Sequence, residues 1–331
     1  SKRKTLKNKN KKFRKTRKQK GGIKTIPQET GATSYSLFDA IRERNSQKIE
    51  KLMRNNVNVN IQDEYGWTPL MWAIYLGLPQ YIIDLIIEKP GINLHTRDIR
   101  GKNVLMIACE YSFPSVVSLL LRKGSSVNDV DIDNKNALFI ACERGMTTMV
   151  DILLQNGANP NIQEREEGIT PLMIATIKQN RDMLVLLIEA GANIDAQEQG
   201  GNTALMTACH TGNLDIVIFF IVNEADLNQT NNEGYTALDM AVIAENLEVV
   251  NILVMNRAIT SGRNINGETT YQWARRMGLT DIADLIREDM QQRNLRTAKM
   301  VAMKGKTKDD KILLPSLPKN VPQKVAEYLG G

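Results

Sequence analysis

Metal binding and nucleophilic catalysis both require reactive side chains that converge, and few residues of this sequence have the chemistry for either. The candidates are three cysteines (Cys109, Cys142 and Cys209) and two histidines (His95 and His210). They are not clustered as the ligands of a zinc site would be, and no nucleophile–base pair or phosphate-binding loop stands at a suitable spacing. We therefore expect no catalytic residues, no metal site and no cofactor, and predict that the chain is not an enzyme.

Each cysteine directly follows an alanine that belongs to a regular series. The alanines recur in steps of 33 to 35 residues, at Ala40, Ala73, Ala108, Ala141, Ala175, Ala208, Ala241 and Ala274. A period in this range indicates one supersecondary unit that is copied and stacked, as in a repeat solenoid. Neighbouring units would stack about 10 Å apart, beyond the Cα separation of about 7 Å that a disulfide allows. We therefore expect reduced, packed thiols in an intracellular protein.

The residues around each alanine predict a helix with a defined start. An apolar residue three positions earlier shares the alanine's helical face. Five positions earlier, seven of the eight units have Thr or Asn, which cap helices, and seven positions earlier they have Gly or Asn, which accept positive φ at a tip. The expected caps are Thr68, Asn103, Asn136, Thr170, Thr203, Thr236 and Thr269, and the expected tip residues are Gly66, Gly101, Asn134, Gly168, Gly201, Gly234 and Gly267.

Two motifs relate this unit to a known family. Thr68-Pro69-Leu70 and Thr170-Pro171-Leu172 open first helices, and Gly157-Ala158-Asn159 and Gly191-Ala192-Asn193 close second helices. Helix, turn, helix and hairpin with these motifs resembles the ankyrin repeat. The resemblance implies an all-α repeat solenoid, an ankyrin-like stack of about eight helix–turn–helix units with β-hairpin tips. The family's histidine after Leu is absent from every unit, which weakens a hydrogen bond at the cap but not the fold assignment.

The repeats divide the chain into three parts. We expect a basic tail and linker over residues 1–34, an array over residues 35–290, and a basic linker with a C-terminal motif over residues 291–331. Within the array we expect units at about 35–63, 64–98, 99–131, 132–165, 166–199, 200–232, 233–265 and 266–290.

Charge is distributed unevenly between these parts. Residues 1–20 contain twelve Lys and Arg and no acidic residue, whereas residues 21–290 contain 22 Lys and Arg against 34 Asp and Glu. So basic a segment buries too little apolar surface to fold alone. We interpret residues 2–20 as a disordered tail, a nuclear-import signal, a nonspecific nucleic-acid contact or a segment that docks on the acidic array. Its composition is similar to that of proteins from large DNA viruses.

The C-terminal part carries a second motif, Leu-Pro-x-x-Val-x-x-x-Val-x-x-Tyr-Leu. Its residues are Leu317, Pro318, Val321, Val325, Tyr328 and Leu329. The pattern resembles the opening of an F-box, which poxvirus-type ankyrin proteins carry in truncated form at this position. The resemblance implies that these residues bind the adaptor subunit of a cullin–RING ubiquitin ligase while the repeats choose the substrate. The alternatives are a short helix that packs on the last unit and a tail without a partner.

Ankyrin-like arrays bind partners through the hairpin tips and the ends of the first helices, which face a concave groove. Aromatic residues fall at such positions in the first half of the array: Tyr65, Trp67, Tyr75 and Tyr111. Exposed Tyr and Trp are common binding anchors, and the alternative is ordinary packing between units. Carboxylates at Glu64, Glu110 and Glu143 favour a basic partner, although they also serve solubility.

These observations predict a non-catalytic protein–protein interaction scaffold. The more specific hypothesis is a substrate receptor for ubiquitin ligation. The alternative is a nuclear adaptor that contacts nucleic acid through its basic tail. We expect a monomer in the nucleus or cytoplasm, of the host cell if the protein is viral. The basic start is not followed by the apolar stretch of a secretory signal, and the apolar runs, such as residues 216–222, are too short to span a membrane.

Overall fold

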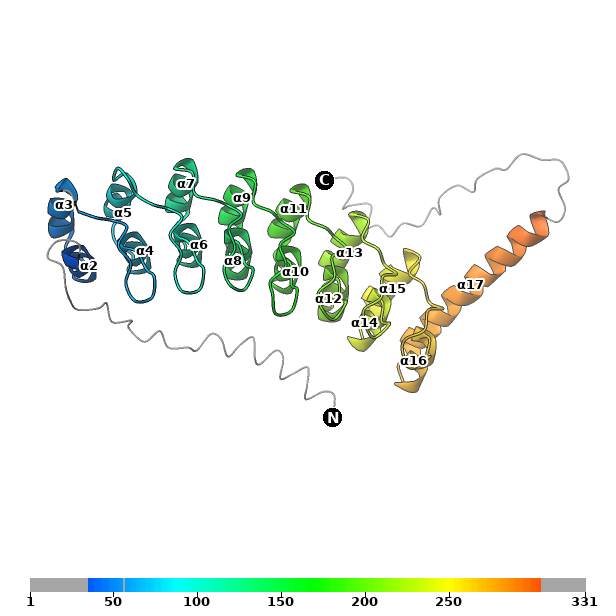
Figure 1. The fold of residues 1–331 in the computed structure, drawn as a ribbon. Helices are drawn as coiled ribbons and strands as arrows, with labels where there is room; N and C mark the ends of the chain where they lie inside the picture. The colour runs from blue at the N-terminus through cyan, green and yellow to red at the C-terminus, as the bar shows by residue number, and fades with distance from the viewer. Residues whose placement is uncertain (1–34, 56, 305–331) are drawn as a thin grey trace. The chain divides into compact units, whose positions relative to one another are not determined.

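The computed structural model describes residues 35–55 and 57–304, which form sixteen helices in eight antiparallel pairs (Figure 1). The all-α repeat architecture is therefore as expected. The chain comprises two structural units, one ending at Ile99 and one beginning at Arg100, and each is described by itself.

The first unit contains two helix pairs. They are α2 (Tyr35–Arg42) with α3 (Ser46–Arg54), and α4 (Pro69–Tyr75) with α5 (Gln80–Ile87). Lys89 follows α5 and binds the end of α3, because its Nζ donates to the carbonyl oxygens of Met53 at 2.6 Å and Asn55 at 2.9 Å. A cation at these carbonyls also complements the negative end of the helix dipole, so Lys89 joins the two pairs.

The second unit contains six helix pairs, with the first helices in one row and the second helices in another (Figure 1). The first helices are α6 (Val104–Glu110), α8 (Ala137–Arg144), α10 (Pro171–Ile177), α12 (Ala204–Thr211), α14 (Ala237–Ile243) and α16 (Thr270–Arg276). The second helices are α7 (Pro114–Arg122), α9 (Thr147–Gln155), α11 (Arg181–Glu189), α13 (Leu214–Val222), α15 (Leu247–Met255) and α17 (Thr280–Lys304).

The predicted caps explain where the first helices begin. All seven accept a hydrogen bond from the backbone N–H three residues on, as Asn136 does from Phe139 at 2.8 Å. Asp239 and Gln272, which stand where the family has histidine, complete capping boxes by accepting from the backbone N–H of Thr236 and Thr269. These two units therefore replace the histidine with another cap-side contact.

The second helices use a cap that the sequence analysis did not identify. Asn180, Asn213 and Asn246 stand 33 residues apart and cap α11, α13 and α15. The Nδ2 of Asn246 also donates to the carbonyl of Gly212 at 3.3 Å, in the preceding repeat. Each of these residues thus starts a helix, and Asn246 also ties it to its neighbour.

Adjacent tips of the second unit are joined by single backbone hydrogen bonds. The donors and acceptors are Ile132 to Arg100, Arg165 to Asp133, Gln199 to Glu167, Asn232 to Gly200 and Ile265 to Glu233, at 2.8–3.2 Å. The described residues contain an isolated bridge between Arg263 and Thr269 but no named strand. The expectation of β-hairpins was therefore too strong: the tips are tight turns, closed by backbone hydrogen bonds within the tips such as that from Asp131 N–H to the carbonyl of Lys135.

One tip shows how a side chain adapts to loop length. Asp131 Oδ1 accepts the backbone N–H groups of Asp133 and Lys135 and closes a tight turn. The turn after Glu164 is one residue longer, since Glu164 N–H donates to the carbonyl of Ile169. The longer Glu side chain spans it by accepting from the N–H groups of Glu166 at 2.8 Å, Glu167 at 2.5 Å and Ile169 at 3.3 Å.

The last helix differs from the expected domain organisation. We placed a linker from residue 291, but α17 continues without interruption to Lys304. Residues 280–304 contain no Gly or Pro, and the first such residue is Gly305, so nothing in the sequence ends the helix earlier. The remainder of the expected linker and the F-box-like segment lie outside the described residues, as does the basic tail.

The repeat alanines and cysteines are packed between helices. The side chains of Ala108, Ala141 and Ala175 are fully buried, which agrees with a close approach between neighbouring first helices. Cys109, Cys142 and Cys209 are free and buried, and burial raises the pKa of each thiol far above its usual value. The thiols are packing groups, as expected, and are poor nucleophiles.

Replacement of Ala141 by Leu tests this close approach. The added atoms have no space between α8 and its neighbours, so we expect Ala141→Leu to lower the free energy of unfolding by about 1–3 kcal/mol. Urea unfolding followed by circular dichroism measures the change. The matched control is Ala190→Leu at an exposed helix end, with an expected effect within about 0.5 kcal/mol; equal effects would contradict the packing argument.

Candidate partner-binding face

In four repeats the residue before the first-helix cap contacts the residue eight positions later, at the end of that helix. In the first unit this pair is Trp67 and Tyr75, whose rings meet edge to face with centroids 5.5 Å apart. In the second unit it is an ion pair in three repeats: Lys102 with Glu110, Lys135 with Glu143, and Glu268 with Arg276. This i, i+8 spacing is a sequence signal that the analysis of the repeats did not use.

In the first unit the aromatic residues form a packed cluster rather than an open patch. Trp72 lies 5.2 Å from Trp67 and 5.4 Å from Tyr75 between ring centroids. The expectation that Trp67 is an exposed anchor is wrong, because only 4% of it is accessible. Its Nε1 donates to Asp98 Oδ2 at 3.1 Å, so the indole turns inward to reach a buried acceptor.

Tyr65, Tyr75 and Glu64 remain accessible on the first unit. Both tyrosines are half-buried and Glu64 is exposed. The charge of Glu64, followed by partial burial, raises the pKa of the Tyr65 hydroxyl. A hydrogen bond with Glu64 acts in the same direction, so the phenol stays protonated at neutral pH.

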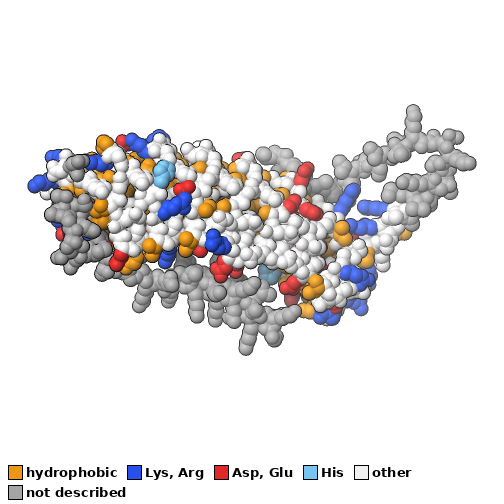
Figure 2. Space-filling view, viewed as in Figure 1, with side chains coloured by type: hydrophobic (Ala, Val, Ile, Leu, Met, Phe, Trp, Pro, Cys, Tyr) orange, Lys and Arg blue, Asp and Glu red, His pale blue; other side chains and the backbone are white. Residues whose placement is uncertain are grey.

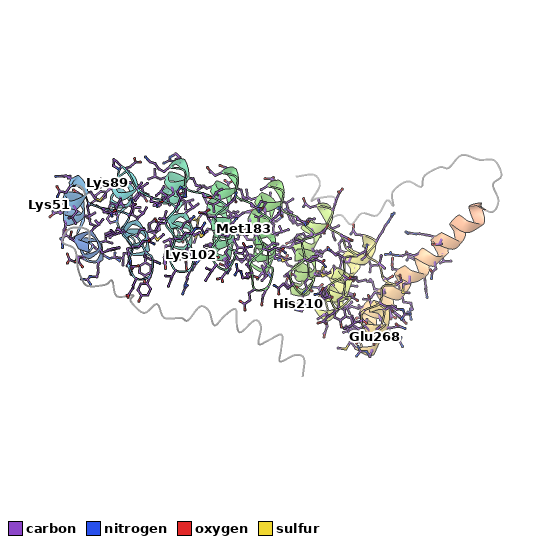
Figure 3. All side chains as sticks on the ribbon, viewed as in Figure 1. Lys51, Lys89, Lys102, Met183, His210 and Glu268 are labelled. Atoms are coloured by element: carbon purple, nitrogen blue, oxygen red, sulfur yellow. The ribbon has the colours of Figure 1, made fainter. Side chains whose placement is uncertain are left out.

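In the second unit the predicted carboxylates Glu110 and Glu143 belong to one charged cluster. Lys102, labelled in Figure 3 just before α6, places Nζ 2.7 Å from Glu110 Oε2. The other carboxylate oxygen of Glu110 lies 3.1 Å from Arg144 Nη2, in the next repeat. Lys135 Nζ lies 2.8 Å from Glu143 Oε1 and 5.1 Å from the centre of the Phe139 ring. The cluster thus links two repeats through side chains.

Burial and charge act against each other on these groups. Burial raises the pKa of Glu110, but the charge and hydrogen bond of Lys102, followed by the charge of Arg144, outweigh it, so the pKa is lowered. For Lys135 burial lowers the pKa, but the hydrogen bond and charge of Glu143 raise it by more, so the pKa is raised overall. Asp131 is the exception, because burial dominates and raises its pKa.

The cluster surrounds a small hollow of about 80 Å³. Its lining combines four cationic and four acidic side chains with one apolar residue: Arg100, Lys102, Lys135, Arg144, Glu110, Asp131, Asp133, Glu143 and Ile140. Small-molecule sites usually enclose about 300–1,000 Å³ and are mainly apolar. The hollow can therefore take a protruding polar side chain of a protein partner, but it is too small and too polar for a typical cofactor.

Of the other residues predicted to bind a partner, the structure describes Tyr111 but not the C-terminal motif. Tyr111 is half-buried at the C-terminal end of α6, directly after Glu110. The motif residues Leu317, Pro318, Val321, Val325, Tyr328 and Leu329 lie outside the described residues, as do residues 2–20. We define the inner face of the second unit as its tips together with the C-terminal ends of its first helices.

Comparison with known proteins decides the family. The sequence profile described as "Ankyrin repeats (3 copies)" matches residues 37–131, 105–198 and 172–266, well over half of the chain. The chain belongs to the ankyrin-repeat family. Ankyrin repeats act as protein–protein interaction scaffolds.

Two similar proteins match part of the array. "Ankyrin repeat domain-containing protein SAT10" of Stachybotrys chartarum is 32% identical over 100 residues, which are 30% of this chain and 5% of that protein. "Putative ankyrin repeat protein YahD" of Escherichia coli is 35% identical over 79 residues, which are 23% of this chain and 39% of that protein. The chain therefore matches less than half the length of either relative.

Two features are absent from residues 35–55 and 57–304. None of the helices there combines the length and the apolar character that crossing a bilayer requires. Over the same residues, no three or more His, Cys, Asp or Glu side chains are grouped so that they could hold a metal ion.

Replacement of Trp67 and Tyr65 separates a structural aromatic from an accessible one. We expect Trp67→Ala to lower the free energy of unfolding by about 3–5 kcal/mol, because it empties a packed site and leaves Asp98 without the indole donor. Tyr65→Ala should cost below about 1 kcal/mol. Urea unfolding measures both, and a Trp67→Ala effect as small as that of Tyr65→Ala would refute the inward position of the indole.

The pH dependence of stability tests the Glu110 ion pairs. Because its pKa is lowered on folding, ionised Glu110 stabilises the protein fully above its unfolded pKa of about 4.3, and this contribution is lost as the pH falls through the lower folded value. We expect Glu110→Gln to cost about 1 kcal/mol at pH 7 and the difference from wild type to shrink towards pH 3. The control is the exposed Glu166→Gln; a pH-independent difference for Glu110→Gln would contradict the account.

Proposed function

We propose that this ankyrin-repeat protein is a non-catalytic scaffold that binds a protein partner on the inner face of its second unit. The observation that supports the proposal is the charged cluster around the hollow, where Glu110 pairs with Lys102 and Arg144. Because these side chains hold one another in place, a partner would meet a preformed pattern of charge, and less conformational freedom is lost on binding.

The exposed charges of this face favour a partner that carries Lys or Arg. Asp133, Glu143, Glu166 and Glu167 are all exposed at tips or at the end of a first helix. Arg144 and Arg165 are exposed between them, so a partner with alternating charge would fit better than a uniformly basic one. Such complementarity raises association rates and discriminates against partners of the wrong charge.

Charge reversal on the inner face tests this proposal. A partner would first be identified by cross-linking in source cells and then purified for titration. We expect Asp133→Lys combined with Glu143→Lys to weaken its binding at least about tenfold, which corresponds to about 1.4 kcal/mol. The control is Glu248→Lys, an exposed carboxylate in the first turn of the second helix α15. Equal weakening by both variants would place the binding site elsewhere.

The finer proposal is that the protein is a substrate receptor for a cullin–RING ubiquitin ligase. It rests on the F-box-like residues Leu317, Pro318, Val321, Val325, Tyr328 and Leu329. Co-purification with the F-box-binding adaptor of the ligase tests it, with the full chain and a version that ends at Asp310. Retention by the full chain alone would support the receptor role, and retention by neither would leave a scaffold without a ligase.

The second candidate is a nuclear adaptor that contacts nucleic acid. The observation that favours it is the concentration of twelve Lys and Arg, with no acid, in residues 1–20. Phosphate contacts of this kind weaken steeply as salt rises. Deletion of residues 1–22 should then abolish salt-sensitive binding to duplex DNA or RNA, whereas unchanged binding would exclude this role for the tail.

A further inference from the structure

The outer surface of the second unit changes character along the row of second helices. In α9 the outward positions are polar, and Gln155 Nε2 donates to Asp151 Oδ1 at 2.9 Å. Two repeats later the equivalent positions of α13 are Ile218 and Val222. Ile218 is buried, but Val222 is 41% exposed, so α13 presents an apolar side chain at the position where α9 presents Gln155.

This apolar surface includes a groove between α11 and α13. The groove has a volume of about 240 Å³, and its apolar lining is Val185, Ile188, Phe219 and Val222. The rest of its lining is polar: Glu189 and Asn223 at the C-terminal ends of the two helices, and Arg181 at the start of α11. Met255, 33 residues after Val222 and at the end of α15, is 48% exposed and extends the apolar character by one repeat.

Apart from Arg181, which lines the groove at the start of α11, the chain that forms and follows the groove carries no positive charge. Residues 182–256 contain eleven Asp and Glu and not a single Lys or Arg. Lys and Arg side chains gather instead over α16 and α17 (Figure 2). An occupant of the groove should therefore combine an apolar surface with Lys or Arg at its flanks.

The C-terminal segment of this chain has that chemistry. Residues 311–329 contain Lys311, Lys319 and Lys324 against one acid, Glu327. Eight residues of the segment are apolar and bulky: Ile312, Leu313, Leu314, Leu317, Val321, Val325, Tyr328 and Leu329.

The course of α17 brings this segment within reach of the groove. Arg293 Nη2 donates to the carbonyl of Val254 at 3.1 Å, which fixes α17 at the C-terminal end of α15. The groove reaches the same end of the outer helices at Glu189 and Asn223, one to two repeats away, or about 10–20 Å. The helix beyond Arg293 runs about 16 Å away from α15 (Figure 1), and residues 305–316 can span up to about 40 Å, so the chain is long enough to return to the groove.

We propose that residues 311–329 bind in the groove between α11 and α13 of the same chain. The segment covers apolar surface that the array leaves open, and its lysines face the acidic surroundings. This inference does not depend on what binds the inner face, which lies on the other row of helices. It has one consequence for the ligase proposal: the adaptor must displace the segment from the groove, because the same apolar residues would be used in both contacts.

Cysteine cross-linking in the full chain tests the proposal. One variant carries Val222→Cys with Val325→Cys, and the control carries Ile177→Cys with Val325→Cys, since Ile177 is 45% exposed at the end of the first helix α10. The native cysteines are buried and should not compete. With oxidised glutathione we expect the Val222 pair to form an intramolecular disulfide at least tenfold faster than the control pair. Equal rates, no disulfide, or a disulfide only between two copies would overturn the proposal.

Hydrogen exchange provides a second measurement that needs no engineered thiol. In the full chain, Val222→Asp should speed the exchange of backbone amides in residues 311–329, whereas Ile177→Asp should leave them unchanged. Because both positions are exposed, neither substitution should unfold the array. Unchanged exchange in the Val222→Asp protein would show that the segment is not held in the groove, whatever the outcome of adaptor co-purification.

Discussion

The structure depends on the close stacking of neighbouring first helices, which alanine at the centre of each helix allows. A helix pair of this kind cannot bury its apolar surface alone, and only the next repeat covers it. In the second unit Ala108, Ala141 and Ala175 are fully buried where a longer side chain would push the helices apart. The fixed step of the alanines along the sequence therefore fixes the step of the repeats in space.

This regular step determines what the tips can do. When successive first helices stack in register, each tip comes close enough to give its neighbour one backbone hydrogen bond, as Ile132 does to Arg100 and Arg165 to Asp133. The same register brings Arg144 of one repeat to Glu110 of the preceding one. The inner face is thus a product of packing, and a partner meets side chains held in place by the array.

The sequence predicted the features that depend on local chemistry. The seven caps, the tip residues with positive φ and the buried alanines all follow from preferences that act within a few residues. Trp67 was misjudged because its exposure depends on Asp98, 31 residues away, which accepts its indole N–H. The i, i+8 pairs also escaped notice, since their two members differ in type from repeat to repeat, although their spacing was present in the sequence throughout. The length of α17 could have been read from the absence of Gly and Pro before Gly305.

The most direct test of this account is native-state hydrogen exchange at the tips of the second unit, resolved to single residues by NMR. The amides of Ile132, Arg165, Gln199 and Asn232 donate to the preceding tip although they lie in exposed turns. If stacking holds the inner face in place, these amides exchange slowly, together with those of the first helices beside them. Exchange as fast as in an unstructured peptide, while the first helices stay protected, would show that stacking does not extend to the tips and would contradict the account.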